Sequence, residues 1–455
     1  MLLFSGVVKC MGRRWMEIPC PLSPTHFFPW VDQLPFSSYS LSMELLSPAG
    51  NREKLAYAYA YGAHAAYIGL KDFSLRAKAD NFSADEAAAL RAITTDRRLY
   101  CALNIYFHQA DLGRLHAELD SIAAYPFDAF IISDVGIAAL VRKRFPAAKL
   151  HLSTQANCTN AEAARVYHDM GFSRIILGRE VTLDEAADIK AKNPGLEVEI
   201  FVHGAMCLAY SGRCFLSAWM AGRSGNQGRC AHSCRWEYRA HSVNQQASVW
   251  LLEEAERPGE YYPVEENAGG FSTILSSRDI CMIDHLPAIK AAGIDAIKIE
   301  GRMKSLYYTA VVTRAYRKHL DALEGRPVPP EDLAAYREDL FKVSHREYCT
   351  GFYFDRSEVE RPTEAEYQEH HVFLGAIGEE VSPGVYAVDV RNQIKAGETI
   401  EYIGPGLPSV ADNAYTLLDE EGKALAKADH GHYVRIRPGT LVQNGYIIRR
   451  SREKM

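Results

Sequence analysis

Several features are missing from this 455-residue sequence, and each absence argues against a class of protein. No run of about 18 apolar residues occurs, so the sequence predicts no transmembrane helix. The formal net charge of -6 argues against a strongly basic protein that binds nucleic acid over its whole surface. Neither a Gly-x-Ser-x-Gly elbow nor a His-Glu-x-x-His zinc motif is present, so two common hydrolase mechanisms lack their signatures.

Residues 1–42 also lack a secretion signal, because no charged start is followed by an apolar stretch and a small-residue cleavage site. They are rich in Pro, Ser and aromatic residues, and we expect them to lie outside the fold, as an upstream extension or a disordered segment. A transit segment is an alternative, but a start codon upstream of a true start at Met43 is the simpler explanation. We therefore expect a cytoplasmic protein, in which clustered cysteines indicate metal or redox chemistry before disulfides.

From Met43 onward, short apolar runs alternate with helical patterns, which is typical of repeated β-α units. Predicted strands begin near residues 43, 65, 98, 129, 149, 174, 198 and 295. Helical patterns lie between most of them, for example at 51–63, 83–96, 135–145, 160–171 and 182–193. Eight strands with intervening helices predict an α/β fold, a (β/α)8 TIM-like barrel over residues 43–325.

The eighth strand is reached only after an insertion at about 205–292, which includes a hairpin-like pattern at 269–280. Because the insertion starts beyond the carboxyl end of a strand, we expect it at the catalytic face of the barrel. Residues 326–370 are predicted to form a helical linker. Alternating apolar and polar residues with Gly and Pro then predict a small C-terminal antiparallel β-barrel domain over 371–455.

Four of the ten cysteines lie in this insertion, at Cys207, Cys214, Cys230 and Cys234, with the spacing Cys-x6-Cys-x15-Cys-x3-Cys. Four thiolates can hold a zinc ion or an iron–sulfur cluster, because both prefer soft sulfur donors. No Cys-x2-Cys knuckle typical of structural zinc is present, and a cluster accepts more varied loops because it spans part of the distance between its ligands. Inert buried thiols are the remaining interpretation.

A hydrolase is the competing interpretation of the same window. Ser211 in AYSGRC could act as a nucleophile, with His203 as its base and Asp134 as the orienting acid. However, a serine followed by glycine more often forms a turn, and no hydrolase motif supports the triad. We therefore favour a cluster-dependent reaction over hydrolysis.

Polar residues recur where the predicted strands end, and in a barrel these ends surround one mouth. The residues with predicted catalytic roles are His203, Arg179, Glu180, Glu300 and Arg302. The residues with predicted substrate-binding roles are Arg76, Asn104, Asp134 and Gln155. The arginines indicate an anionic ligand, because guanidinium groups bind carboxylate or phosphate bidentately. The histidine could instead hydrogen-bond a neighbouring strand, and the glutamate at position 300 could be an ion-pair partner of Arg302.

Several motifs together resemble one known family. They are SPAG in the first strand, EIFVHGAMCLAYSGRCFLS and GRCAHSCRWEY around the cysteines, and KIEGRMKS in the eighth strand. In these motifs the sequence resembles the peptidase U32 family, also described as collagenase-like, from Met43 to about the end of the C-terminal domain. RPGEY at 257–261 and the tyrosine pair that follows IKIEGR are similar to its tRNA hydroxylation branch.

The resemblance implies an enzyme that forms 5-hydroxyuridine at the wobble position of certain tRNAs. It also implies a [4Fe-4S] cluster on Cys207, Cys214, Cys230 and Cys234, and prephenate, a dicarboxylate, as the hydroxyl source in place of oxygen. That the strand-end arginines bind prephenate is our own hypothesis. Related branches imply the alternatives, which are hydroxylation of rRNA or of a quinone precursor, and the peptidase activity that the family name preserves.

An acidic protein needs a local basic surface to bind tRNA. The first candidate is the C-terminal domain with its basic end, which includes Arg435, Arg437, Arg449, Arg450 and Arg452. The alternative is that these charges only keep the end of the chain solvated.

Overall fold

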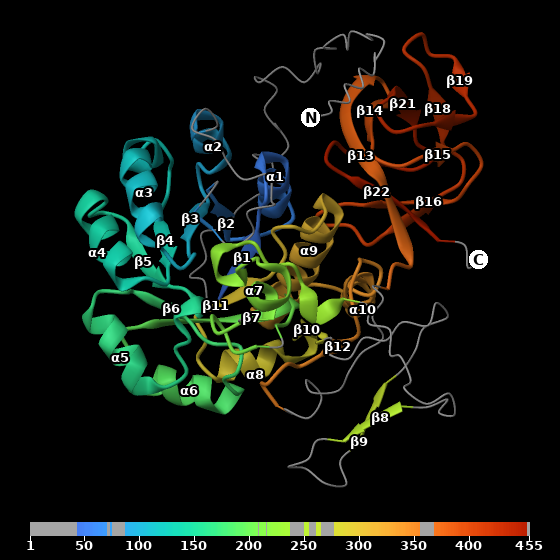
Figure 1. The fold of residues 1–455 in the computed structure, drawn as a ribbon. Coiled ribbons are helices and arrows are strands. Elements are labelled where there is room, and N and C mark those ends of the chain that lie inside the picture. The colour runs from blue at the N-terminus through green and yellow to red at the C-terminus, as the bar shows by residue number, and fades with distance from the viewer. Residues whose placement is uncertain are drawn as a thin grey trace, which may run out of the picture.

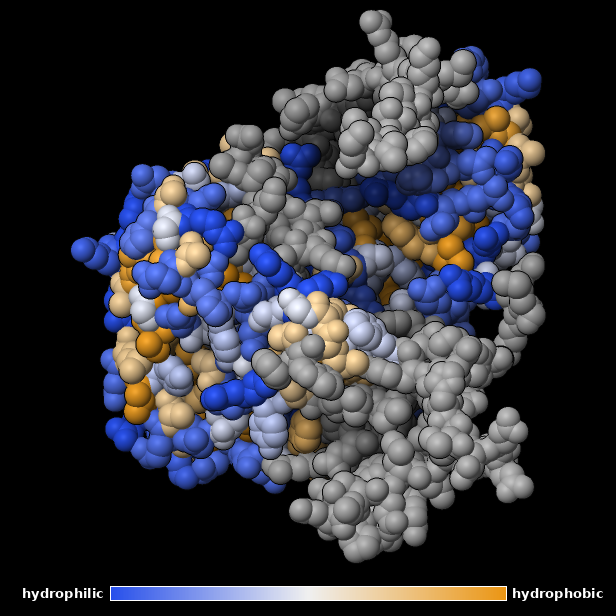
Figure 2. All heavy atoms as spheres, in the orientation of Figure 1, coloured by the Kyte–Doolittle hydropathy of each residue, from blue (hydrophilic) through white to orange (hydrophobic). Residues whose placement is uncertain are grey.

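The computed structural model describes residues 43–70, 73–74, 87–207, 209–214, 216–236, 250–253, 261–264, 277–354 and 368–452. The predicted extension at 1–42 and most of the predicted hairpin at 269–280 lie outside the described residues. Figure 1 shows a large barrel surrounded by helices and a smaller part built from strands. On the face shown in Figure 2, most of the coloured surface is hydrophilic, and hydrophobic residues lie in scattered groups among the hydrophilic ones.

Eight parallel strands form the barrel. They are β1 (Glu44–Pro48), β2 (Ala65–Gly69), β3 (Arg98–Leu103), β4 (Ala129–Ile132), β5 (Lys149–Leu152), β6 (Arg174–Ile176), β7 (Glu197–Ala205) and β11 (Ala296–Ile299). The strands from β1 to β7 pair in sequence order, each with its neighbour. Strand β11 pairs with both β7 and β1, so the ring closes. The predicted TIM-like barrel is thus confirmed, and each strand starts close to its predicted position.

Helices cover the outside of the barrel. They are α1 (Arg52–Ala60), α2 (Ala87–Ile93), α3 (Gln109–Ile122), α4 (Val135–Arg144), α5 (Ala161–Asp169), α6 (Leu183–Lys192), α8 (Leu286–Ala291) and α9 (Leu306–Leu323). Polar side chains fix several helix starts, since Asn51, Asn160 and Thr182 each accept a backbone N–H from the first turn of their helix. None of the helices in the described part of the chain is both long and apolar enough to cross a bilayer.

The insertion after β7 carries its own small elements. They are the short helix α7 (Leu216–Ala221), 3-10 turns at Gly225–Gln227 and Ser233–Arg235, the hairpin of β8 (Trp250–Glu253) and β9 (Tyr261–Val264), β10 (Asp279–Cys281) and the 3-10 turn Ile283–His285. Strand β10 runs antiparallel to the end of β7 and pairs with β12 (Tyr348–Cys349). The end of the insertion therefore extends the barrel sheet beyond β7, a pairing that the sequence pattern did not predict.

The C-terminal part follows α10 (Pro330–Asp339) and begins at β13. Its strands are β13 (His371–Ser382), β14 (Val385–Val390), β15 (Ile394–Lys395), β16 (Ile400–Ile403), β17 (Val410–Asp412), β18 (Thr416–Leu418), β19 (Ala424–Leu425), β20 (Lys427–Ala428), β21 (Tyr433–Arg437) and β22 (Ile447–Ser451). The main sheet is antiparallel in the order β17-β16-β22-β13-β14-β21-β18-β19, with β15 and β20 as a separate pair. Because no described pairing joins β17 to β19, the predicted antiparallel barrel takes the form of a half-barrel.

Buried polar contacts join the two parts. Arg449 of β22 and Arg314 of α9 both pair with the Asp339 carboxylate at the end of α10. The Tyr61 hydroxyl, just after α1, donates to the Ile403 carbonyl of β16 at 2.8 Å. Since Arg314 and Arg449 are fully buried, we infer that these contacts fix the C-terminal part against the barrel.

Candidate active site at the barrel mouth

A cavity of about 150 Å³ lies at the carboxyl ends of the barrel strands. Side chains from five strands form its floor. They are Tyr67 of β2, Ala102 of β3, Ile131 of β4, Ile176 of β6 and Phe201 of β7. Residues of the insertion, including the four cysteines, line the same cavity. The insertion therefore covers the face of the barrel at which such folds carry their active sites.

Three basic side chains and one carboxylate line this cavity, namely Arg179, Lys298, Arg302 and Glu300. Arg179 lies 3.6 Å from the Glu300 carboxylate, and its guanidinium lies 4.0 Å from the centre of the Phe201 ring. Its Nε atom is buried and has no hydrogen-bond partner among the described residues. An excess of basic groups around a partly enclosed space favours an anionic ligand.

The Arg302 side chain is held in the wall of the cavity. This residue is 3% exposed, and one terminal nitrogen donates to Ser74 Oγ at 3.0 Å. The guanidinium passes so close to Gly69 that a Cβ atom there would lie 1.8 Å from the same nitrogen. Glycine at the end of β2 is therefore required for the position of Arg302.

Lys298 is a lining residue that the sequence pattern did not single out. Its Nζ lies 3.0 Å from Glu199 Oε1 and 4.3 Å from the centre of the Tyr67 ring. Burial lowers the pKa of Lys298, although the Glu199 carboxylate opposes this shift. The pairing of β7 and β11 also changes register between Lys298 and Ile299, and such irregularities occur often beside active sites. The available signal was a lysine within the apolar run AIKI.

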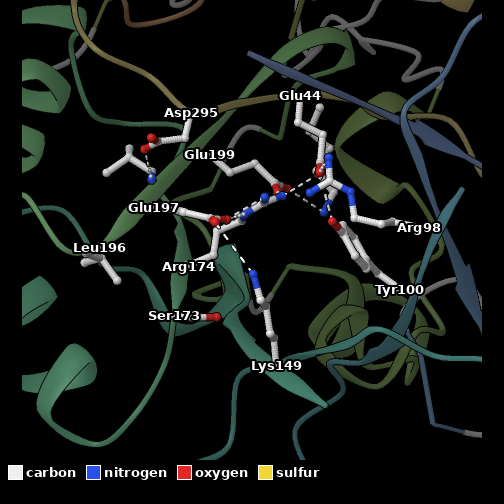
Figure 3. A network of polar contacts seen from close by, with 12 residues as sticks. Glu44, Arg98, Tyr100, Lys149, Ser173, Arg174, Leu196, Glu197, Glu199 and Asp295 are labelled. Atoms are coloured by element: carbon white, nitrogen blue, oxygen red, sulfur yellow. Dashed lines mark hydrogen bonds and ion pairs between the residues drawn. The ribbon is translucent and has the colours of Figure 1, made fainter. Parts of the chain in front are cut away.

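Ionised groups fill the amino-terminal end of the barrel, below the cavity floor (Figure 3). Arg174 lies 2.6 Å from Glu44, 2.6 Å from Glu197 and 3.0 Å from Glu199. Burial alone raises the pKa of Glu44, but the charge and hydrogen bonds of Arg174 outweigh burial with the help of Arg98, so that the pKa is lowered. Because Glu199 also binds the cavity lysine, this network supports the cavity floor.

All four cysteines with predicted ligand roles line the cavity, and none of them is in a disulfide among the described residues; they are Cys207, Cys214, Cys230 and Cys234. A hydrogen bond with the Cys207 thiol, together with burial, raises the pKa of Cys214. No three His, Cys, Asp or Glu side chains in the described ranges are gathered closely enough to hold a metal ion. One zinc ion needs all its sulfur ligands about 2.3 Å from a single point. A cluster offers separate iron atoms to separate thiols, so this donor set suits a cluster better than a single ion.

The segment 207–236, which we call the cysteine loop, is tied to the barrel through Ser211. The Ser211 hydroxyl accepts the backbone N–H of Arg179 at 3.2 Å and lies 3.3 Å from Thr154 Oγ1. The backbone N–H of Ser211 donates to the Glu180 carboxylate. Glu180 itself is not among the residues that line the cavity, so the structure assigns its carboxylate a contact that positions the loop.

A second contact lies at Gly212, whose φ of +73° is in the left-handed region. A Cβ atom at this position would lie 2.2 Å from the Gln155 carbonyl oxygen. The Tyr106 hydroxyl donates to the Gly212 carbonyl oxygen at 2.6 Å. The backbone N–H of Tyr106 donates to the Asn226 carbonyl at 3.0 Å. The loop can approach the mouth this closely only with glycine at position 212.

The residues with predicted substrate-binding roles have different surroundings. Asn104 and Gln155 line the cavity, and the Asn104 amide donates to Ser153 Oγ at 3.4 Å. Asp134 is not among the lining residues, and its carboxylate accepts two backbone N–H groups at the start of α4, as an N-cap does. Arg76 lies outside the described residues. The predicted roles of these four residues stay predictions.

His203 lies away from the cavity lining, in a cluster of tyrosines behind β7. Its two ring nitrogens lie 3.4 Å from the Tyr316 hydroxyl and 3.3 Å from the Tyr348 hydroxyl. Burial, with the nearby charges of His345 and Lys304, lowers the pKa of His203 to about 3. A neutral imidazole enclosed in this way supports the structural alternative for His203 over a role as a base for Ser211.

The arginines at the basic end of the chain are largely used within the protein. Arg449 is buried against Asp339 and Glu401, Arg450 pairs with Glu398, and Arg452 pairs with Glu369; Arg435 donates to the Glu420 carbonyl. These contacts reduce the positive charge that this part of the chain can offer to a phosphate backbone.

The fold and the cavity together define a class: closed (β/α)8 barrels with a cysteine loop over the mouth and a C-terminal antiparallel half-barrel. The chain belongs to peptidase family U32. The sequence model of that family matches residues 50–363, and the model of the peptidase family U32 C-terminal domain matches residues 369–449.

Curated relatives extend this likeness over most of the chain. The tRNA hydroxylation protein P of Escherichia coli (strain K12) is 35% identical over 401 residues, which cover 80% of this chain and 86% of that protein. The tRNA hydroxylation protein P1 of Bacillus subtilis (strain 168) is 33% identical over 392 residues, or 85% and 89% of the two chains. The 23S rRNA 5-hydroxycytidine C2501 synthase of Escherichia coli (strain K12) is 33% identical over 282 residues, 62% of this chain and 40% of that protein.

Proposed function

We propose that this chain is an RNA hydroxylase and, more specifically, that it hydroxylates uridine to 5-hydroxyuridine at the wobble position of tRNA. Support comes from relatives named for tRNA hydroxylation, which are 33% to 35% identical over 80% to 85% of this chain. A further relative is named for making 5-hydroxycytidine in rRNA, so RNA hydroxylation is common to these names. The observation on which the proposal depends most is that four thiols and three basic side chains line one cavity. A reaction on tRNA also implies a cytoplasmic enzyme.

The proposal includes a [4Fe-4S] cluster held by Cys207, Cys214, Cys230 and Cys234. Their common cavity supports it, as does the backbone N–H of His232, which donates to Cys230 Sγ at 3.4 Å, because backbone N–H groups stabilise cluster sulfurs. When bound, such a cluster would supply electron transfer, because cysteine ligands on all four irons leave no iron open to a substrate. The residues of the chain orient the substrates and exclude water around it.

The hydroxyl donor in this proposal is a small dicarboxylate, prephenate, and not molecular oxygen. The cavity offers Arg179, Lys298 and Arg302 against one lining carboxylate, which supports the binding of a dianion. Glu199 holds Lys298 by an ion pair, and Ser74 accepts a hydrogen bond from Arg302. Both cationic side chains are therefore oriented before a ligand binds. Arg302→Ala should therefore lose tRNA hydroxylation in cells.

The peptidase alternative rests on Ser211, and its surroundings disfavour it. The hydroxyl of Ser211 is engaged by Arg179 N–H and lies beside Thr154, while His203 is held among tyrosines. A serine nucleophile needs a base within hydrogen-bond reach. Hydroxylation of rRNA is a second candidate, favoured by the name of the rRNA-hydroxylating relative.

Nucleoside mass spectrometry tests the proposal. The full chain is expressed in a strain that lacks tRNA 5-hydroxyuridine, and total tRNA and rRNA are analysed. We expect 5-hydroxyuridine derivatives to appear in tRNA with the wild type and to be absent with Cys207→Ser. Cys281→Ser, at a partly exposed cysteine outside the cavity lining, is the matched control and should retain the product and the iron content of the anaerobically purified protein. Unchanged tRNA with a newly hydroxylated rRNA would instead establish the second candidate.

A further inference from the structure

The cysteine loop has an unusual charge. Residues 207–236 contain Arg213, Arg223, Arg229 and Arg235 and no aspartate or glutamate, although the whole chain has 57 acidic against 51 basic residues. A locally basic segment in an acidic chain favours contact with a polyanion. This segment is also the one that lines the cavity opposite the barrel strands.

Two of these arginines are exposed and available. Arg213 and Arg229 are exposed, and neither forms an ion pair with a carboxylate in the described part of the chain. Arg223 is half-buried and donates to the Cys230 carbonyl at 3.4 Å, which places it within the loop. The Glu180 carboxylate accepts the Ser211 N–H, and no ion pair joins it to Arg213 or Arg229 among the described residues. The two exposed arginines therefore keep their donors available for phosphate oxygens.

An aromatic side chain stands next to this charge. Tyr210 is 61% exposed and yet lines the cavity, so its ring lies between solvent and the site. At the far end of the loop, Trp236 is 39% exposed, and its indole N–H donates to the Ala231 carbonyl at 3.0 Å. Exposed aromatic rings combined with arginines are the usual means of binding unstacked bases of single-stranded RNA.

We propose that the cysteine loop is the RNA-docking surface, with Arg213 and Arg229 on phosphates and Tyr210 stacked on the base that enters the cavity. This inference rests on the proposed RNA hydroxylation and replaces the expectation that the C-terminal domain binds the RNA. A base must leave its stack to reach a cavity in the barrel, and an aromatic ring at the entrance compensates for the lost stacking. An anticodon loop, whose bases are already unpaired, fits this requirement best.

Binding and turnover are measured separately to test the proposal. The probe is total tRNA from a strain that lacks 5-hydroxyuridine, and its affinity for the complete protein is measured by fluorescence anisotropy at several salt concentrations. For Arg213→Ala/Arg229→Ala we expect at least a roughly tenfold weaker affinity and a salt slope reduced by about 2, because two phosphate contacts are lost. The matched control is Arg437→Ala/Arg452→Ala, two exposed arginines of the C-terminal part, which should change affinity by less than about twofold.

Tyr210 is tested by turnover. Tyr210→Ala should lower hydroxylation by roughly 5- to 150-fold, which corresponds to about 1–3 kcal/mol of stacking, with an unchanged salt slope. Tyr210→Phe should restore the rate, because the ring and not the hydroxyl stacks. If the loop double variant binds tRNA like the wild type while the C-terminal control loses affinity, this proposal is wrong even though hydroxylation stands. If the wild type neither binds nor hydroxylates tRNA, the proposed function itself fails with it.

Discussion

At the amino-terminal end of the barrel, Arg174 is surrounded by three carboxylates, whereas at the carboxyl-terminal end Arg179 lies 3.6 Å from one carboxylate, and its buried Nε has no partner among the residues that the structure describes. Both arginines come from the same segment of the chain, one at the start of β6 and one just after its end. The first is neutralised by the protein, and the second is left with capacity to bind a ligand.

The same difference extends to the neighbouring groups. At the amino-terminal end, Glu44 receives hydrogen bonds from Tyr100 and from Arg174, so its charge is satisfied within the fold (Figure 3). At the mouth, basic residues outnumber acidic ones, and the loop above carries arginines without acidic residues. We infer that the amino-terminal end serves stability and specific packing, while the mouth places several cationic groups around a space that a ligand can enter.

The largest effect on stability is expected from Arg174→Met. This change leaves Glu44, Glu197 and Glu199 without their shared cation, and breaking a buried ion pair in this way costs about 3–5 kcal/mol or more. Urea unfolding followed by circular dichroism measures the loss. Arg213→Met at the exposed mouth is the matched control and should change the free energy of unfolding by less than about 0.5 kcal/mol. Equal losses in the two variants would contradict the assigned difference between the two ends.

A smaller, pH-dependent effect is expected from Glu44→Gln. The pKa of Glu44 is lowered in the folded protein, so this carboxylate contributes stability above its unfolded pKa of about 4.5, and the contribution is lost as the pH falls through the lower folded pKa. We expect the variant to be less stable than the wild type by about 3 kcal/mol at pH 7, the lower end of the cost of breaking a buried pair, with the gap narrowing below about pH 4.5. Urea titrations from pH 8 to pH 3 measure the gap. A gap that stays constant down to pH 3 would show that Glu44 is not ionised against Arg174.

The fold was largely predictable from the sequence, because each barrel strand is a short apolar run buried on both sides and separated from the next by a helix. The pairing of β10 with β12 was not predicted, because neither strand is a long apolar run. They have three and two residues, and their pairing joins parts of the chain that are more than 60 positions apart, as between Asp279 and Tyr348. No local periodicity records such a contact.

The candidate site was only partly predictable. Several of the polar residues predicted after strands line the cavity, but the pattern could not separate Arg179, which lines it, from Asp134, which caps a helix. The sequence pattern also did not single out Lys298. In a closed barrel both sides of a strand are buried, so a single lysine in an apolar run does not reveal whether its side chain faces the inside or the outside of the barrel. The direction is set by the register between β7 and β11, which depends on the whole ring.

The smallest of these effects concerns Ser211, whose hydroxyl ties the cysteine loop to the mouth through ordinary hydrogen bonds. Ser211→Ala removes the acceptor of the Arg179 backbone N–H, and we expect a loss of about 1–2 kcal/mol because a buried donor is left unsatisfied. Ser217→Ala is a matched control in the same loop, since the Ser217 hydroxyl accepts the Ala231 N–H at 2.8 Å and donates to the Arg223 carbonyl at 2.6 Å. Thermal unfolding and limited proteolysis of the loop should report similar losses for both variants. A loss of peptide hydrolysis confined to Ser211→Ala, without any change in stability, would mean that this serine is a nucleophile, and the mouth would then be a protease site and not an anion-binding one.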